Sequence, residues 1–226
     1  MCLNNWGGID HKVLEFHEYV NLFSGKSGSG KSTVMDAIQV ILYGSFSPSF
    51  LNKAADDAKN RRSVLSYLRG EQKDGSANRK DCDFCSVIAL EIEDTGTHII
   101  TCIGIAFEVR KSDSEIKKFV YFSHSGKMPE SEYLTEQGVC YSNQEIKKLV
   151  SARTKSDDNR GKGEVNRIYG SKEAYLGTLY DVILGYIDQN RFITMEKSAI
   201  ALKMTNGTGQ FIRCLLYTSP SPRDRG

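Results

Sequence analysis

The strongest constraint on the fold is an eight-residue stretch, GKSGSGKS, at residues 25–32. It satisfies the pattern G-x-x-x-x-G-K-[ST] of the phosphate-binding P-loop without a mismatch. A loop can surround the oxygens of a triphosphate only when its backbone N–H groups turn inward, and residues without a bulky Cβ favour that conformation. The spacing therefore predicts a nucleotide-binding loop.

Each position of the loop has an expected role. Lys31 should place its ammonium near the β and γ phosphates, and the Ser32 hydroxyl is the expected ligand of Mg²⁺. Glycines supply the backbone freedom, and Thr33 lies beside the metal ligand. The predicted nucleotide-binding residues are Gly25, Lys26, Ser27, Gly28, Ser29, Gly30, Lys31, Ser32 and Thr33.

The flanking residues fit this interpretation. Before the loop, YVNLF at residues 19–23 is a short apolar run that predicts a buried strand. After it, apolar residues recur at helical spacing, so the phosphates would lie at a helix N-terminus, where the macrodipole favours anions. These helical positions are Val34, Met35, Ala37, Ile38, Ile41 and Leu42.

A longer stretch around the loop resembles a known family. SGKSGSGKSTVMDAIQVILYG at residues 24–44 resembles the N-terminal ATPase head of the SMC, MukB and SbcC group. NNWGGIDHKVLEF at residues 4–16 is similar to the first strands of that head. NRRSVLSYLRGE at residues 60–71 narrows the resemblance to the condensin-like ATPase of Wadjet-type plasmid-defence systems and its MukB-like relatives. The resemblance covers most of residues 1–213.

This resemblance implies a fold and a function. The fold class would be α/β, the N-terminal half of an ABC-type P-loop NTPase head with an antiparallel β-subdomain. The cofactors would be ATP and Mg²⁺. A coiled coil, the Walker B strand and the signature loop would lie in a C-terminal half. The partners would be DNA, a second head in a homodimer, and accessory kleisin-like or nuclease subunits, in chromosome organisation or plasmid defence. Hydrolysis would need the other half and the second head.

The resemblance also suggests functional roles for residues outside the loop. Arg69 and Arg62 are similar to an arginine that contacts phosphate or DNA, although arginines beside a short amphipathic segment also fit a solvated face. Gln210 in GTGQFI is the candidate for the Q-loop glutamine, with Gln189 in reserve. VILGYID at residues 182–188 resembles a Walker B strand, but it continues a helical period and no Glu follows its Asp, so we do not expect it to bind Mg²⁺.

The remaining sequence predicts a β-rich middle and a helical end. Residues 44–59 predict an irregular connection. Three strand-like runs within 86–125, joined by short polar connections, predict an antiparallel meander, with His98 and His124 at the surface. The helical part extends over about 142–213, with helices at 142–150 and 171–184 and a loop at 151–164.

Charge, hydropathy and cysteine spacing argue against several other classes of protein. A net charge of +2 predicts no global attraction to nucleic acid. No run is long and apolar enough to span a membrane, and the N-terminus resembles no leader, so we expect a cytoplasmic protein without membrane contact. Cys82 and Cys85 form a CxxC without a second ligand pair, which indicates free thiols at a strand entrance.

Two alternatives remain open at this stage. Residues 214–224, CLLYTSPSPRD, resemble the translation of a sequencing adapter, which would end the natural sequence at Arg213; a disordered tail is the alternative. The chain could also be a self-contained P-loop enzyme, such as a nucleotide kinase or GTPase. A non-catalytic interaction domain is disfavoured because Lys31 and Ser32 are both intact.

Overall fold

The computed structural model describes residues 1–26, 28–47, 63–72, 75–157 and 165–201. The chain divides into two compact units, Met1–Gln189 and Asn190–Gly226. The first unit contains a sheet and the helices packed on it. Helix α5 (Gln189–Ala201) begins at the boundary between the units. No helix in the described ranges is long and apolar enough to cross a membrane.

The centre of the first unit is a six-stranded sheet in the order β2-β1-β3-β4-β5-β6, in which every pairing is antiparallel. Strands β3, β4 and β5 form the meander that the sequence predicts, because their short connections permit only antiparallel neighbours. The strands are β1 (Cys2–Trp6), β2 (Ile9–Val13), β3 (Phe84–Glu93), β4 (Ile100–Val109), β5 (Lys118–Ser125) and β6 (Arg167–Tyr169).

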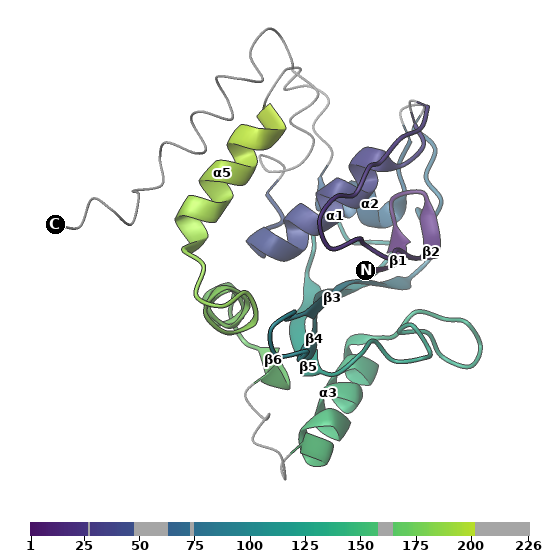
Figure 1. Cartoon of the computed structure of the whole chain (residues 1–226). Coiled ribbons are helices and arrows are strands. Elements are labelled where there is room, and N and C mark those ends of the chain that lie inside the picture. Colours follow the sequence, from purple (N-terminus) through teal and green to yellow (C-terminus); the bar gives the residue numbers. More distant parts are fainter. Residues whose placement is uncertain (27, 48–62, 73–74, 158–164, 202–226) are drawn as a thin grey trace, which may run out of the picture. The chain divides into compact units, whose positions relative to one another are not determined.

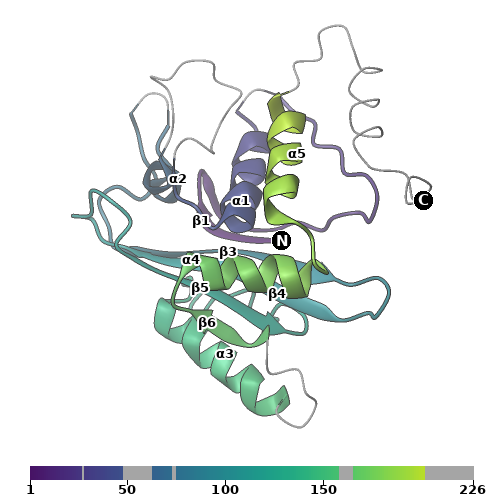
Figure 2. The same cartoon turned by 90° about the vertical axis from the view of Figure 1, so that its left-hand side faces the viewer.

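Helices cover both faces of this sheet (Figures 1 and 2). Helix α1 (Lys31–Tyr43) lies against β3 and β4, and α4 (Lys172–Gly177) lies on the same face against β5 and β6. Helix α3 (Asn143–Asp157) covers the opposite face, where it packs on β4, β5 and β6. The short helix α2 (Val64–Arg69) packs on β1. The alternation of side chains along each strand therefore supplies two apolar layers.

The layer under α3 is one continuous core. Ala106 and Phe122, from neighbouring strands, pack there against Ile146 and Val150 of α3. The helix begins with a capping box, in which the Ser142 backbone N–H donates to the Glu145 carboxylate (2.7 Å) and the Glu145 N–H donates to the Ser142 hydroxyl (3.4 Å). The predicted helix at 142–150 is thus confirmed, with its N-terminus in the expected place.

The predicted loop at 151–164 is wrong for its first part. Helix α3 continues to Asp157, and residues 158–164 lie outside the described part. The segment lacks large apolar residues because it forms the outer surface of the helix. Its hydroxyls bond locally, since Thr154 donates to the Val150 carbonyl (3.0 Å) and Ser156 to the Arg153 carbonyl (2.9 Å).

The predicted helix at 171–184 is confirmed, but in two pieces. Ser171 caps α4 by accepting from the Ala174 N–H, and the chain continues as a π-helix, η4 (Thr178–Ile183). Tyr175 and Tyr180 of this segment are buried. The helical conformation extends into residues 182–188, where no strand forms, so the expectation that this stretch is not a Walker B strand is confirmed.

The predicted strand at residues 19–23 is wrong. This segment has no strand pairing, and the side chains of Tyr19 and Leu22 are 83% and 90% exposed. A strand needs a neighbour for its backbone N–H and C=O groups, and none of the six strands of the sheet pairs with this segment. β-propensity reflects the surroundings of a segment, so an apolar β-branched run alone does not make a strand.

His124 is also not the surface residue that the sequence predicts. Its side chain is 0% exposed, because alternation along β5 places it on the same face as Phe122, under the loop that precedes α3. Its Nε2 lies 2.9 Å from the Tyr133 hydroxyl and its Nδ1 3.0 Å from the Ser125 carbonyl oxygen. Burial lowers the pKa of His124 to about 4. His98, in contrast, is exposed and lies 3.1 Å from the Glu93 carboxylate, as expected.

Three buried tyrosines hold the C-terminal end of α1. The hydroxyls of Tyr175, Tyr180 and Tyr121 donate to the carbonyl oxygens of Ile41, Leu42 and Gly44, at 2.9, 2.9 and 2.6 Å. The last carbonyl groups of a helix have no partner within the helix, so side chains must satisfy them when the end is buried. These bonds tie the predicted P-loop helix to the sheet and to α4.

Candidate functional site

The glycine loop forms the tight turn that its sequence predicts. Gly30 is the N-cap of α1 and has a left-handed φ of 88°, which residues with a Cβ adopt rarely. At Gly25 the restriction is contact, because an added Cβ would lie 2.6 Å from the Ser29 hydroxyl. The loop closes on itself through a hydrogen bond from the Ser29 N–H to the Lys26 carbonyl (3.2 Å). Side-chain-free positions are therefore required where the pattern has glycine.

Lys31 turns its ammonium back over this loop. Its Nζ donates to the carbonyl oxygens of Gly25 (2.6 Å) and Lys26 (2.9 Å) and to the Ser29 hydroxyl (3.2 Å). The ammonium is therefore held within hydrogen-bond distance of three loop residues. Phosphate oxygens that enter the loop would be charge-assisted acceptors for the same ammonium, and such bonds are stronger than those to neutral carbonyls.

The N-terminus of α1 is open to an anion. Its N-cap makes no side-chain hydrogen bond and its first turn contains no acidic residue, so neither compensates the positive end of the helix dipole. Ser32, in this turn, is exposed. One hydroxyl beside a phosphate site fits Mg²⁺, which commonly takes few protein ligands and completes its shell with phosphate oxygens and water.

A group of buried residues behind the loop escaped the sequence analysis. The indole Nε1 of Trp6 donates to the Thr33 carbonyl (2.9 Å), and the Tyr67 hydroxyl donates to the Asp36 carboxylate. Arg79 donates to the Leu68 carbonyl (2.9 Å) and, in the turn after β1, to the Gly7 carbonyl. These contacts join residues far apart in sequence, so periodicity could not find them. The only available signal was an acid, Asp36, among apolar helix positions.

Of the other candidate residues, the structure describes Arg69 and Gln189. Arg69 donates to the carbonyl oxygens of Lys111 (3.2 Å) and Asp113 (2.5 Å), so the structure gives it bonds to the β4–β5 connection. Gln189 is the first residue of α5. Ser27, Arg62 and Gln210 lie outside the described residues, as does most of the connection predicted at 44–59. The roles proposed for these residues stay predictions.

The CxxC pair behaves as two thiols. Cys82 is exposed and Cys85 is half-buried near the start of β3, and both are free. Burial raises the pKa of Cys85 to about 11, which keeps it protonated at neutral pH. Among the described residues, no group of three His, Cys, Asp or Glu side chains could hold a metal ion. The expected location of the CxxC pair at the start of a strand is confirmed, because Cys85 is the second residue of β3.

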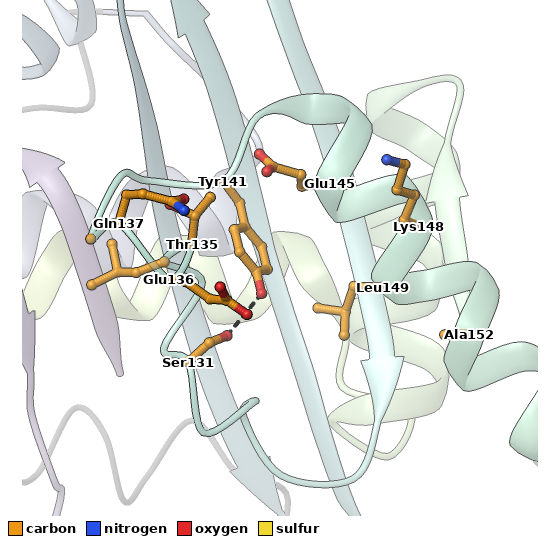
Figure 3. A pocket seen from close by; sticks show the side chains of 11 residues that line it. Ser131, Thr135, Glu136, Gln137, Tyr141, Glu145, Lys148, Leu149 and Ala152 are labelled. Atoms are coloured by element: carbon orange, nitrogen blue, oxygen red, sulfur yellow. Dashed lines mark hydrogen bonds between the residues drawn. The ribbon is translucent and has the colours of Figure 1, made fainter.

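A shallow hollow lies on the opposite face of the sheet, between the loop that precedes α3 and the helix itself (Figure 3). Tyr141 and Leu149 line it, and the Tyr141 hydroxyl is 2.9 Å from the Ser131 hydroxyl. Glu145, which also lines it, caps α3. Its side chains serve local structure, and we assign this hollow no chemistry.

Comparisons with known proteins agree with the loop. A family model described as the P-loop containing region of AAA domain matches residues 1–58, about a quarter of the chain. No curated protein matches the sequence. The match includes the two N-terminal strands, the glycine loop and α1. The N-terminus of the chain is therefore a P-loop region, and both its geometry and the family match support nucleotide binding.

Proposed function

We propose that this chain binds ATP with Mg²⁺ at residues 25–33. The observation that carries the proposal is the Lys31 ammonium held over the loop at an uncapped helix N-terminus. Backbone N–H donors, a helix dipole and a fixed cation together form an anion site that suits a polyphosphate. The family match to a P-loop region also supports a nucleotide.

We further propose that the chain is the N-terminal part of an ATPase head of the SMC, MukB and SbcC group, which acts on DNA. The support is the sequence resemblance at residues 4–16, 24–44 and 60–71, together with the antiparallel sheet that follows the loop helix. ATP hydrolysis would then require the C-terminal half and a second head.

Exposed apolar surface next to the loop supports the proposal that a C-terminal half completes the head. Tyr19, Val20 and Leu22, just before the loop, are each at least 78% exposed, and Met35 of α1 is 38% exposed. Helix α1 thus has an apolar residue on its exposed face as well as on its buried face, and such a helix is expected to be covered by protein on both sides. In the proposed head, strands of the C-terminal half would pack on this surface.

The ATP proposal is tested by isothermal titration calorimetry of the full chain with ATP and Mg²⁺. Lys31→Ala should weaken binding about tenfold or more, because it removes a charged hydrogen-bond donor. Lys147→Ala is the matched control, since Lys147 is exposed on α3, which packs on the other face of the sheet. Equal ATP affinities of the wild type and Lys31→Ala would refute the proposed site.

A further inference from the structure

Trp6 reaches the P-loop helix because of one irregular residue in β1. Asn5 has a left-handed φ of 54°, a conformation that asparagine tolerates better than most residues. It interrupts the alternation of side chains that Cys2, Leu3 and Asn4 follow. The Trp6 ring, which is 0% exposed, then places its Nε1 2.9 Å from the Thr33 carbonyl oxygen. Thr33 directly follows the predicted Mg²⁺ ligand.

Tyr67 of α2 binds the next turn of α1. Its ring stacks on Trp6, with centroids 5.1 Å apart and planes 7° from parallel. Its hydroxyl donates to the buried Asp36 carboxylate, which is one helical turn beyond Ser32 and Thr33. The Tyr67 carbonyl also accepts from the Gly7 N–H (2.8 Å). Trp6 and Tyr67 thus bind α1 at two successive turns.

The turn after β1 closes this arrangement. A Cβ on Gly7 would lie 2.5 Å from the Thr33 methyl group, so the turn backbone packs directly on Thr33. Arg79, which is 6% exposed, donates to the Gly7 and Leu68 carbonyl oxygens and to the Asp10 carboxylate (2.8 Å). The turn is therefore bonded to Tyr67 of α2 and to Arg79, and Arg79 is in turn bonded to α2 and β2.

We infer that Tyr67 is a positioning residue for nucleotide binding, acting with Trp6 through the first turns of α1. The inference rests on the proposed function of the P-loop. Phosphates require the N–H groups of the first helical turn to point at one place, and these groups lack partners within the helix. The Trp6 and Tyr67 hydrogen bonds fix the part of α1 that carries those N–H groups.

The expected effect on the apparent Kd follows from the fraction of molecules in which α1 is oriented to bind phosphate. Without the Tyr67 hydroxyl, the first turns of α1 sample orientations that do not bind phosphate, and the apparent Kd rises as the binding-competent fraction falls. The loss of a hydrogen bond of ordinary net strength corresponds to a Kd increase of at most about fivefold. Tyr67→Phe keeps the ring that stacks on Trp6 and removes only the hydroxyl.

Tyr180→Phe provides a matched control. Tyr180 is also 1% exposed, and its hydroxyl donates to the Leu42 carbonyl at the other end of the same helix. Both substitutions remove one buried hydroxyl bonded to α1, so both should lower the melting temperature. Only Tyr67→Phe should weaken ATP binding when calorimetry is performed at a temperature where circular dichroism shows each variant folded.

Trp6 gives a second measurement that needs no change at Tyr67. It is the single tryptophan of the chain, so the emission of the whole protein reports on the indole bonded to Thr33. Adding ATP and Mg²⁺ should shift this emission in the wild type and not in Lys31→Ala. Unchanged emission in a wild type that binds ATP would overturn the inference, even if Tyr67→Phe does not fold.

The outcomes separate the two proposals. A wild type that binds ATP in a Lys31-dependent manner, with equal affinity in Tyr67→Phe, keeps the proposed function and overturns the positioning role. An equal loss of ATP affinity in Tyr180→Phe also overturns the positioning role, because the lower stability of α1 would then explain the weaker binding in both variants. A wild type that does not bind ATP refutes the proposed function, and the positioning role with it.

Discussion

Acid should destabilise this protein through one buried histidine. The pKa of His124 is lowered from 6.5 to about 4, first by burial and then by the charge of Arg153, against the raising effects of the Ser125 carbonyl and Glu91. Unfolding exposes the ring and restores its ordinary pKa, so between these values the unfolded state binds the additional proton. This contribution to stability is complete above pH 6.5 and is lost as the pH falls toward 4.

The size of the effect follows from the shift. The difference between 6.5 and about 4 corresponds to about 3 kcal/mol in the free energy of unfolding. No reduction for solvent screening applies, since the side chain is 0% exposed. The assay is urea unfolding at a series of pH values between 4 and 7.5, an interval chosen to span about the full titration of the ring.

The informative comparison is with His124→Gln, which does not titrate in this range. It should be less stable at neutral pH, because it loses packing under the loop before α3, but its stability should fall less on acidification by about 3 kcal/mol. His98→Gln is the control, since that histidine is exposed. Parallel pH curves for the wild type and His124→Gln would refute the reasoning.

Two further predictions concern the sheet and the reaction. Gly104→Ala should lower the free energy of unfolding by about 3 kcal/mol, because its Cβ would lie 2.4 Å from the Ile88 carbonyl oxygen. Urea unfolding measures this loss, and Gly8→Ala is the control, since Gly8 has open space around it and its midpoint should change little. A Gly104→Ala variant as stable as the wild type would contradict the packing. If the chain is part of a split head, as proposed, the catalytic base would lie in the C-terminal half, and the chain alone should release phosphate from ATP at least about a hundredfold more slowly than the two halves together. Robust Lys31-dependent phosphate release would instead favour a self-contained P-loop enzyme.

Local sequence signals identified the elements with strong periodicity. The glycine spacing and the apolar positions after Lys31 predict the loop and α1, and the alternation in residues 86–125 predicts the meander of β3, β4 and β5. The capping residues Ser142 and Ser171 mark two helix starts correctly. In each case the information lies within a few residues of the feature that it determines.

The errors occurred where distant residues decide the outcome. Residues 19–23 have the composition of a strand, but a strand also needs a neighbour, and no strand of the sheet pairs with them. The position of His124 at the edge of a strand-like run predicts a surface residue, although its register in β5 places it in the core. The contacts of Trp6 with Thr33 and of Tyr67 with Asp36 span 27 and 31 residues. No periodic pattern encodes such pairs.

The most direct test of phosphate binding at the loop is hydrogen–deuterium exchange of the full chain with and without ATP and Mg²⁺. The N–H groups at the start of α1 have no partner within the helix and should exchange quickly until phosphate oxygens accept from them. We predict slower exchange in peptides that cover residues 28–34 of the wild type, and no change there in Lys31→Ala. Unchanged exchange in these peptides at an ATP concentration that saturates binding would contradict a P-loop nucleotide site.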